Sequence, residues 1–242
     1  MATSLVIAEA LVAESVTVRY GGVTALDDAS LRVDCGAIVG LIGPNGAGKT
    51  TLINAITGVV RPSSGTIALG KNRLDRLPAH RVARAGIART YQNVRLFARL
   101  DVAENVRAGA FARNATLSDV EIVALLERTG SIERDLHRRA GALPYGEQRR
   151  LEIARALAAR PATLLLDEPA AGMNPVETVA LGRTIASVAA SGVGILLVEH
   201  DMSLVAAVCT SVVVLNFGRV IATGTPQEVA RDPAVVEAYL GT

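Results

Sequence analysis

The sequence predicts an α/β protein with a mainly parallel core sheet, an N-terminal antiparallel β subdomain and an inserted helical subdomain. Four short apolar runs, at residues 37–43, 163–169, 194–200 and 211–218, predict buried strands. Ala-rich segments with helical spacing separate most of these runs, and such alternation is typical of a parallel sheet covered by helices. Half of the residues are hydrophobic, which suits strands that are buried on both faces.

Two other regions differ from this pattern. Residues 15–20 and 29–34 alternate apolar with polar side chains, as half-exposed strands do, and predict a small antiparallel sheet at the N-terminal edge. Residues 93–157 contain no convincing strand, whereas residues 117–130 have helical spacing. We therefore expect a helical insertion within the α/β core.

The length of 242 residues suffices for one sizeable hydrophobic core. The sequence shows no internal repeat and no low-complexity linker. We expect one domain over residues 1–242, with a core lobe at about 1–92 and 158–242 and a helical subdomain at about 93–157.

Composition argues against nucleic-acid binding and membrane insertion. The net charge is only +2 and aromatic residues make up 3%, so neither a basic footprint nor a stacking platform for nucleic acid is expected. The mean hydropathy is high at +0.35, but the longest uncharged run, residues 202–218, falls short of the about 20 apolar residues of a membrane span. Glu9 interrupts the N-terminal apolar stretch, which lacks a basic region, so no signal peptide is expected. Cys35 and Cys209 lack metal or redox spacing and are expected to be free thiols in a reducing cytosol.

A phosphate-binding loop is the strongest motif. Residues 43–50 fit the pattern G-x-x-x-x-G-K-[ST], between an apolar strand and a helix that ends at Gly58. Glycines let successive amides point at phosphates, and the helix N-terminus adds its positive dipole. Lys49 supplies a positive charge for the β- and γ-phosphates, and the Thr50 hydroxyl can ligate Mg²⁺. The alternative is a glycine-rich turn with a solvated lysine.

Two acidic residues end the second apolar run. Asp167 can hold Mg²⁺ directly or through water, and Glu168 can orient and deprotonate an attacking water. The alternative is an acidic strand end that binds nothing. Together with the phosphate loop, the pair predicts a P-loop NTPase.

Five features in this order resemble the motifs of ATP-binding cassette (ABC) ATPases. Residues 43–50 correspond to the Walker A motif, Gln92 to the Q-loop, residues 143–148 to the signature, Asp167–Glu168 to the Walker B motif and His200 to the switch histidine. The resemblance covers essentially the whole chain. It implies a nucleotide site that uses ATP and Mg²⁺.

Within that family, five stretches resemble the ATP-binding subunits of branched-chain amino-acid importers. Importers of other amino acids, amides and urea share much of this pattern. The stretches are residues 88–106, 143–157, 167–175, 198–202 and 238–241.

The resemblance also implies individual roles. Tyr20 stands at the adenine-stacking position, although a tyrosine that only packs a strand end is the alternative. Gln92 would meet Mg²⁺ or the attacking water, and His200 would donate a hydrogen bond to the γ-phosphate; a surface glutamine and a structural histidine are the alternatives. The expected catalytic residues are Glu168, His200 and Gln92, and the expected Mg²⁺ ligands are Thr50, Gln92 and Asp167. His80 and His137 receive no role. The expected nucleotide contacts are Tyr20, Gly43, Pro44, Asn45, Gly46, Ala47, Gly48, Lys49, Thr50, Thr51 and Asp167.

The signature segment is expected to act on the ATP of a second subunit, across a dimer interface. It consists of Leu143, Pro144, Tyr145, Gly146, Glu147 and Gln148. The family most often has serine and glycine where this chain has Pro144 and Tyr145, so a side-chain donor to the γ-phosphate is missing and dimer closure should be weaker. Glu147 stands where the family often has glutamine, and Asn174 stands where the loop after the Walker B motif often has aspartate.

By resemblance, the chain is the ATP-hydrolysing subunit of an ABC importer that couples ATP-driven dimer closure to uptake of branched-chain or related amino acids. Its expected partners are transmembrane permease subunits, a second ABC ATPase subunit and, indirectly, a periplasmic binding protein, but no nucleic acid. Its expected place is the cytoplasmic face of the inner membrane, bound peripherally, with residues 93–107 lining the groove for the permease. A GTPase is the first rival, but NKxD and DxxG motifs are absent. A non-transport ABC ATPase and an importer subunit for urea, amides or another small polar solute stay open.

Overall fold

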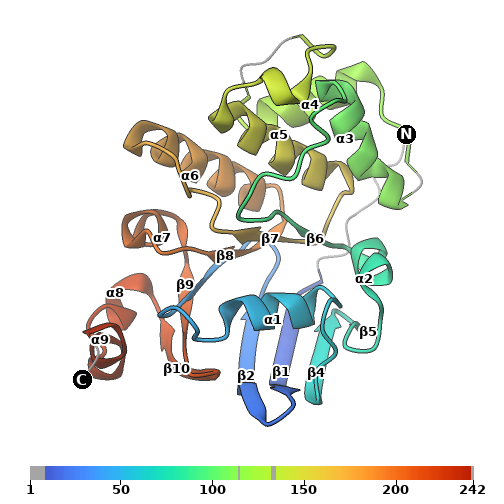
Figure 1. Ribbon diagram of the computed structural model, residues 1–242. Coiled ribbons are helices and arrows are strands. Elements are labelled where there is room, and N and C mark those ends of the chain that lie inside the picture. The colour runs from blue at the N-terminus through green and yellow to red at the C-terminus, as the bar shows by residue number, and fades with distance from the viewer. Residues whose placement is uncertain (1–8, 114, 132–134, 241–242) are drawn as a thin grey trace.

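The computed structural model describes residues 9–113, 115–131 and 135–240. The sequence-based expectations for residues 1–8 and for residue 241 fall outside these ranges. Two β-sheets and two groups of helices make up the described fold (Figure 1).

The first sheet is antiparallel and has the strand order β2-β1-β4-β5. β1 (Leu11–Tyr20) pairs with β2 (Val23–Val33) on one side and with β4 (Ser64–Leu69) on the other, and β5 (Asn72–Arg73) forms the edge. The alternating pattern of residues 29–34 is confirmed, since Ala29, Leu31 and Val33 are buried between exposed neighbours. The predicted antiparallel sheet is therefore present, with two further strands that the sequence patterns did not identify.

The second sheet forms the core, with the strand order β10-β9-β3-β8-β7-β6. Its strands are parallel except for the hairpin of β9 and β10. The four predicted apolar strands are confirmed as β3, β7, β8 and β9, while β6 and β10 are additions. The bounds are β3 (Ile38–Ile42), β6 (Ile87–Arg89), β7 (Thr163–Asp167), β8 (Gly194–Val198), β9 (Ser211–Asn216) and β10 (Arg219–Gly224).

Helices cover both faces of the core sheet. α1 (Lys49–Ile56) lies between the two sheets, whereas α6 (Pro175–Ala190) and α7 (Met202–Val208) lie beyond the opposite face (Figure 1). Neighbouring residues of β3 therefore belong to different hydrophobic clusters, Leu41 to the one with α1 and Ile42 to the one with α6 and α7. The remaining helices of this part are α2 (Ala79–Ala85), α8 (Pro226–Val229) and α9 (Pro233–Leu240).

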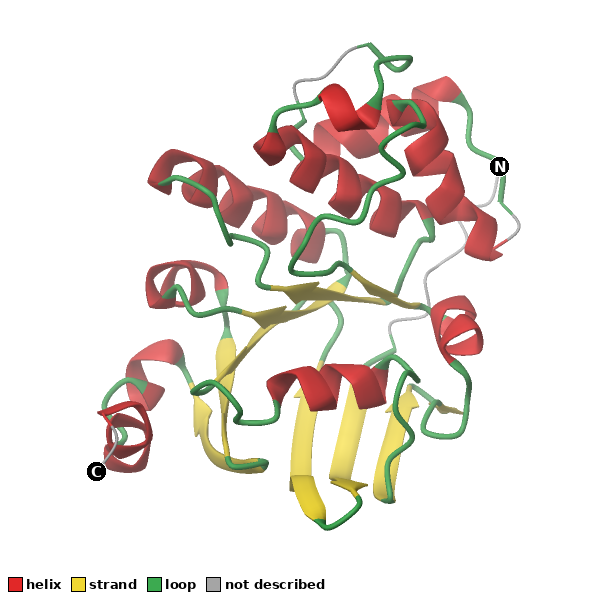
Figure 2. Ribbon diagram, in the orientation of Figure 1, coloured by secondary structure: helices red, strands yellow, loops and turns green. Residues whose placement is uncertain are grey.

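The helical region packs around a third hydrophobic cluster. It contains α3 (Val102–Ala110), α4 (Asp119–Arg128) and α5 (Tyr145–Ala158), with 3-10 turns at Phe111–Arg113 and Ala140–Ala142. Within the described part of residues 93–157 there is no strand, as predicted (Figure 2). The boundaries of the subdomain at residues 92 and 158 stay a prediction.

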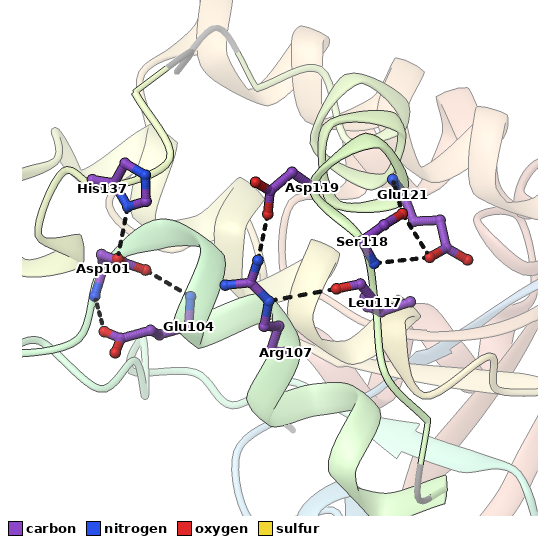
Figure 3. Close-up of polar contacts among 8 residues, drawn as sticks. All are labelled: Asp101, Glu104, Arg107, Leu117, Ser118, Asp119, Glu121 and His137. Carbon is purple, nitrogen blue, oxygen red and sulfur yellow. Dashed lines mark hydrogen bonds and ion pairs between the residues drawn. The ribbon is translucent and has the colours of Figure 1, made fainter.

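Polar side chains fix the starts of two of these helices (Figure 3). Asp101 and Glu104 form a reciprocal capping box at α3, and Ser118 and Glu121 form another at α4. Arg107 joins the two helices through the carboxylate of Asp119. His137 lies 3.3 Å from the Asp101 carboxylate at the surface.

Among the described residues, no helix has both the length and the apolarity to cross a membrane. Cys35 and Cys209 are free thiols, and burial raises the pKa of Cys209 to about 12.

Candidate functional site

The phosphate loop connects β3 to α1, as the motif predicts. Gly43, Gly46 and Gly48 all have positive φ, a conformation that favours glycine. A Cβ on Gly43 would lie 2.1 Å from the Leu215 carbonyl oxygen, and one on Gly48 would lie 2.8 Å from the Ala25 carbonyl oxygen. Gly43 and Gly48 are therefore required both by the backbone conformation and by close packing against β9 and β2, whereas Gly46 is favoured by its backbone conformation alone.

Lys49 opens α1 and is only 8% exposed. Its ammonium donates to the carbonyl oxygens of Gly43, at 2.6 Å, and Pro44, at 3.0 Å. Burial lowers the pKa of Lys49, and the nearby carboxylates of Glu168 and Asp167 counteract part of that effect. The lysine is thus folded onto its own loop, within the field of the two predicted acidic residues.

A cavity of about 410 Å³ opens in front of this loop. Two of the three predicted catalytic residues, Glu168 and His200, line it together with the phosphate loop. The other lining residues come from the start of β2 and from the β9–β10 turn. The complete lining is Val23, Thr24, Ala25, Asn45, Gly46, Ala47, Gly48, Lys49, Thr50, Thr51, Glu168, His200, Phe217 and Gly218.

The three predicted catalytic side chains meet at the Glu168 carboxylate. Gln92 Nε2 donates to one oxygen at 2.7 Å, and His200 Nε2 lies 2.9 Å from the other. Glu168 also has a φ of +47°, a left-handed conformation that is uncommon for glutamate and concentrates at functional sites. The carboxylate is therefore held from two sides at the edge of the cavity, where it can accept a proton from a water.

Asp167 has a partner that the sequence patterns did not reveal. Its carboxylate accepts a hydrogen bond from Arg89 at 2.8 Å, and the two side chains are 13% and 9% exposed. Arg89 also donates to the Asn54 side chain at 2.7 Å. Asp167 does not line the cavity. The one sequence signal was a basic residue three positions before Gln92, which did not point to Asp167.

Glu199 is a second supporting residue that the sequence reasoning missed. It is 4% exposed and accepts hydrogen bonds from the backbone amides of Ala170, at 2.8 Å, and His200, at 3.1 Å. Burial raises the pKa of its carboxyl group. Glu199 therefore joins the loop after Glu168 to the start of the His200 loop.

The signature segment leads into α5, and none of residues 143–148 lines the cavity. Pro144 is the N-cap residue, with φ −55° and ψ 151°, so it precedes the first helical turn rather than standing in it. Tyr145 begins the helix, is 41% exposed and donates its hydroxyl to the Ala171 carbonyl at 3.1 Å. Gly146, in the first turn, is half-buried, and Leu143 is buried. The helix start is thus a surface separate from the phosphate loop.

Arg149 links this helix to the Gln92 segment, another contact without a sequence signal. The side chain is fully buried and donates to the carbonyl oxygens of Tyr91, at 2.7 Å, and Gln92, at 2.6 Å. Its charge is balanced by Glu152, at 2.8 Å. Arg149 therefore connects α5 to the backbone of Tyr91 and Gln92.

Two departures from the common family pattern, Glu147 in the signature segment and Asn174 in the loop after the Walker B motif, have local structural roles. Glu147 is buried and binds Ser131 and Arg150, each at 2.6 Å. Asn174 caps α6 in a capping box with Glu177, a role that asparagine and aspartate fill equally well. Gln148 donates to the Leu143 carbonyl at 2.8 Å, which closes the segment on itself.

The structure does not bring Tyr20 into the cavity. Tyr20 ends β1, is 49% exposed and is absent from the lining. His80 and His137 are exposed as well. The adenine-stacking role of Tyr20 stays a prediction.

The residues expected to hold Mg²⁺ suit that ion chemically. Within the described ranges there is no group of three or more His, Cys, Asp or Glu that would form a complete protein cage. Thr50, Gln92 and Asp167 instead offer hydroxyl, amide and carboxylate oxygens, and Mg²⁺ usually takes one or two carboxylates together with substrate phosphates. The donor set therefore fits.

Two family profiles match the chain. Residues 26–171 match a profile described as "ABC transporter", and residues 219–242 match one described as "Branched-chain amino acid ATP-binding cassette transporter". The first covers more than half of the chain and contains the phosphate loop, the signature segment and Glu168.

Curated relatives and solved structures agree with the profiles. The chain is 43% identical to the high-affinity branched-chain amino acid transport ATP-binding protein LivG of Escherichia coli K12 (92% of this chain, 94% of that protein). It is 42% identical to BraF, of the same description, from Pseudomonas aeruginosa (93% and 95%), and 37% identical to the lipopolysaccharide export system ATP-binding protein LptB of Escherichia coli K12 (96% and 97%). An ATP-binding cassette of an ABC transporter crystallised in its ADP conformation superposes with a TM-score of 0.87 at 28% identity, covering 97% of this chain and 99% of that one. A phosphate loop facing a Glu168–His200 pair, the superposition and these identities lead to one conclusion: the chain belongs to the ABC transporter family of ATP-binding proteins and is an ATPase.

Proposed function

We propose that the chain is the ATP-hydrolysing subunit of an importer of branched-chain or related amino acids. It would bind transmembrane permease subunits at the cytoplasmic face of the inner membrane, beside a second ABC ATPase subunit. A periplasmic binding protein would deliver the solute to the permease. The match of residues 219–242 and the 42–43% identity to BraF and LivG support this assignment.

The observation that carries the hydrolytic assignment is the Glu168 carboxylate, held between Gln92 and His200 beside the phosphate loop. In this proposal Lys49 and the loop amides bind the phosphates. Glu168 orients the attacking water and accepts its proton, while Gln92 positions the water and His200 donates a hydrogen bond to the γ-phosphate.

Mg²⁺ would be held by Thr50, by Gln92 and by Asp167, the last through water if Arg89 keeps its carboxylate. The ion would neutralise phosphate charge. The Arg89–Asp167 pair fixes the position of that carboxylate at the end of β7, next to Glu168.

The signature segment would complete the site of the second subunit. Its place outside the cavity of its own chain supports this, as does a helix start that presents Gly146. Backbone amides at a helix N-terminus attract an anion, here the γ-phosphate of the partner's ATP. ATP binding would close the dimer, and hydrolysis would let it open.

The permease would dock near the Gln92 segment. The lining of a second cavity of about 540 Å³ includes Tyr91, Arg95, Phe97 and Arg155. Arg95 and Phe97 fall within the predicted groove at residues 93–107, and Phe97 is 55% exposed. Arg149 donates hydrogen bonds to the carbonyl oxygens of Tyr91 and Gln92. A permease bound at this cavity would therefore be coupled to α5 through these bonds.

A lipopolysaccharide exporter is the second candidate, since LptB is 37% identical over nearly the whole chain. The profile match at residues 219–242 and the higher identity to BraF and LivG favour import. Import of urea, amides or another small polar solute, and a cassette without a transport role, are outcomes that the following experiment can reveal.

The test is co-purification followed by reconstitution. The tagged chain should retain integral membrane permease subunits, and the assembled complex in vesicles should take up labelled leucine only with ATP and a binding protein. Partners that are all soluble would overturn the transporter assignment. Uptake of urea or amides instead of leucine would overturn the choice of solute and leave the import mechanism standing.

A further inference from the structure

Of the cavity-lining residues that have no role proposed above, Phe217 is the aromatic one. Phe217 lines the cavity beside the phosphate loop and is 86% exposed. Val23, also in the lining, is 67% exposed. The cavity thus has an apolar part, formed by these two residues, and a polar part at residues 45–51, Glu168 and His200. A flat apolar ligand group that covers an exposed aromatic ring removes apolar surface from water, which makes binding more favourable.

The local fold does not account for an aromatic residue at this position. Phe217 and Gly218 form the two-residue turn between β9 and β10, with φ values of +44° and +80°. Hairpin turns with positive φ at both positions favour Asn, Asp or Gly, and a bulky residue there is an outlier. Among the described non-glycine residues with positive φ, Glu168 and Phe217 are the two that line the cavity. A fold-driven choice at position 217 would be asparagine.

The turn is fixed to the phosphate loop. The amide of Gly218 donates to the carbonyl of Ala47 at 2.9 Å, and the carbonyl of Gly218 accepts from the amide of Asp27 at 2.9 Å. A Cβ on Gly218 would lie 2.8 Å from the Ala25 carbonyl oxygen, so the turn rests directly on β2. Phe217 is therefore held at a set position relative to the amides that would bind phosphate.

We propose that Phe217 is a stacking contact for the base of the bound nucleotide. The inference rests on the proposed nucleotide site and adds an aromatic surface on the β9–β10 turn to it. The phosphate loop grips the phosphates of any nucleotide, whereas an aromatic face contacts only the base. Stacking is tolerant of base identity because every base has a π-face. The contact should therefore increase the affinity for GTP as it does for ATP.

The test compares ATP with inorganic tripolyphosphate, which lacks a base, by calorimetry on the full chain. Phe217→Asn places the favoured turn residue at position 217, so its thermal stability should equal or exceed that of the parent. We expect the Kd for ATP to rise about tenfold, in the range of a single base–aromatic contact, and the Kd for tripolyphosphate to stay unchanged. Phe111→Ala is the matched control, because Phe111 is 78% exposed and lies outside the cavity.

A second variant reads the contact directly. The chain has no tryptophan, so Phe217→Trp introduces a single reporter, whose emission ATP should quench and tripolyphosphate should not. Equal ATP affinity of the parent and Phe217→Asn would overturn the inference alone. An equal loss for ATP and tripolyphosphate would also overturn it, since the phosphate loop would then be the part disturbed. Failure of the parent to bind either ligand would overturn the nucleotide site itself.

Discussion

The phosphate loop and the signature segment differ in how much of their chemistry lies within one chain. Around the phosphate loop, Lys49, Glu168 and His200 come together from three distant parts of the sequence. The start of α5 shares no cavity with them, although Arg149 ties it to the backbone of Gln92. The contrast supports the proposal that the chain binds the nucleotide alone, whereas its signature segment would serve a second subunit.

Glu168→Gln is expected to have the largest effect, because it removes the proton acceptor and leaves the phosphate-binding residues in place. Glutamine keeps the shape of glutamate and can still bind Gln92 and His200, but it cannot accept the proton of water. Turnover in the assembled transporter should fall by about 10²–10⁴-fold, and ATP affinity should be retained. Near-normal steady-state hydrolysis would remove Glu168 as the general base.

Pro144→Ser tests the signature segment. The added hydroxyl can donate to the γ-phosphate of the partner's ATP, and a charge-assisted hydrogen bond contributes about 1.5–3 kcal/mol. ATP-dependent dimer closure and turnover should therefore rise about tenfold, while the ATP affinity of the isolated chain stays constant. Pro144→Ala is the control for losing the ring. Unchanged or lower activity of the serine variant would sink this explanation.

Glu199→Gln tests, through the pH dependence of stability, the buried carboxyl group that joins the Glu168 loop to the His200 loop. The folded-state pKa of Glu199 is raised by burial. The stability that the protonated group contributes is therefore fully present below the unfolded-state pKa of about 4.3 and is lost as the pH rises through the folded-state pKa. Denaturation at several pH values should show the parent losing free energy of unfolding relative to the variant from acid to neutral pH. A constant difference between the two proteins would contradict the raised pKa.

Asn174 variants should have the smallest effect. They concern the loop between Glu168 and α6. Asn174→Ala removes the cap of α6 and should cost about 1 kcal/mol of stability, whereas Asn174→Asp keeps the cap and should cost little. Chemical denaturation measures both. Equal losses for alanine and aspartate would show that the capping box does not hold α6.

The sequence was most informative where the residues of a site or an element follow one another along the chain. The phosphate loop could be predicted because its glycines, lysine and threonine follow one another between a strand and a helix. The strands β3, β7, β8 and β9 could be predicted from unbroken apolar runs. β6 could not, since three residues, Ile87–Arg89, are too few for any periodic pattern.

Contacts between distant residues could not be predicted from patterns. The Arg89–Asp167 pair joins positions 78 residues apart, and the buried Arg149 reaches the Tyr91 and Gln92 carbonyls from another element. Phe217 looked like the end of an apolar run, and only the packing of its turn on the phosphate loop places it in the cavity. Such meetings depend on the tertiary arrangement of β6, α5 and the β9–β10 turn.

We expect the nucleotide affinity of the isolated chain to come from the phosphate loop and not from the signature segment of the same chain. The most direct measurement is the ATP Kd of the isolated subunit for Lys49→Ala and Gly146→Asp, side by side with the parent. Removal of the Lys49 charge should weaken binding tenfold or more, on the order of one charge-assisted contact. Gly146→Asp should leave the Kd within about twofold of the parent, although the added carboxylate would repel the partner's γ-phosphate in the assembled dimer. An equal loss of affinity in both variants would contradict this expectation, because it would place the signature segment in the site of its own chain.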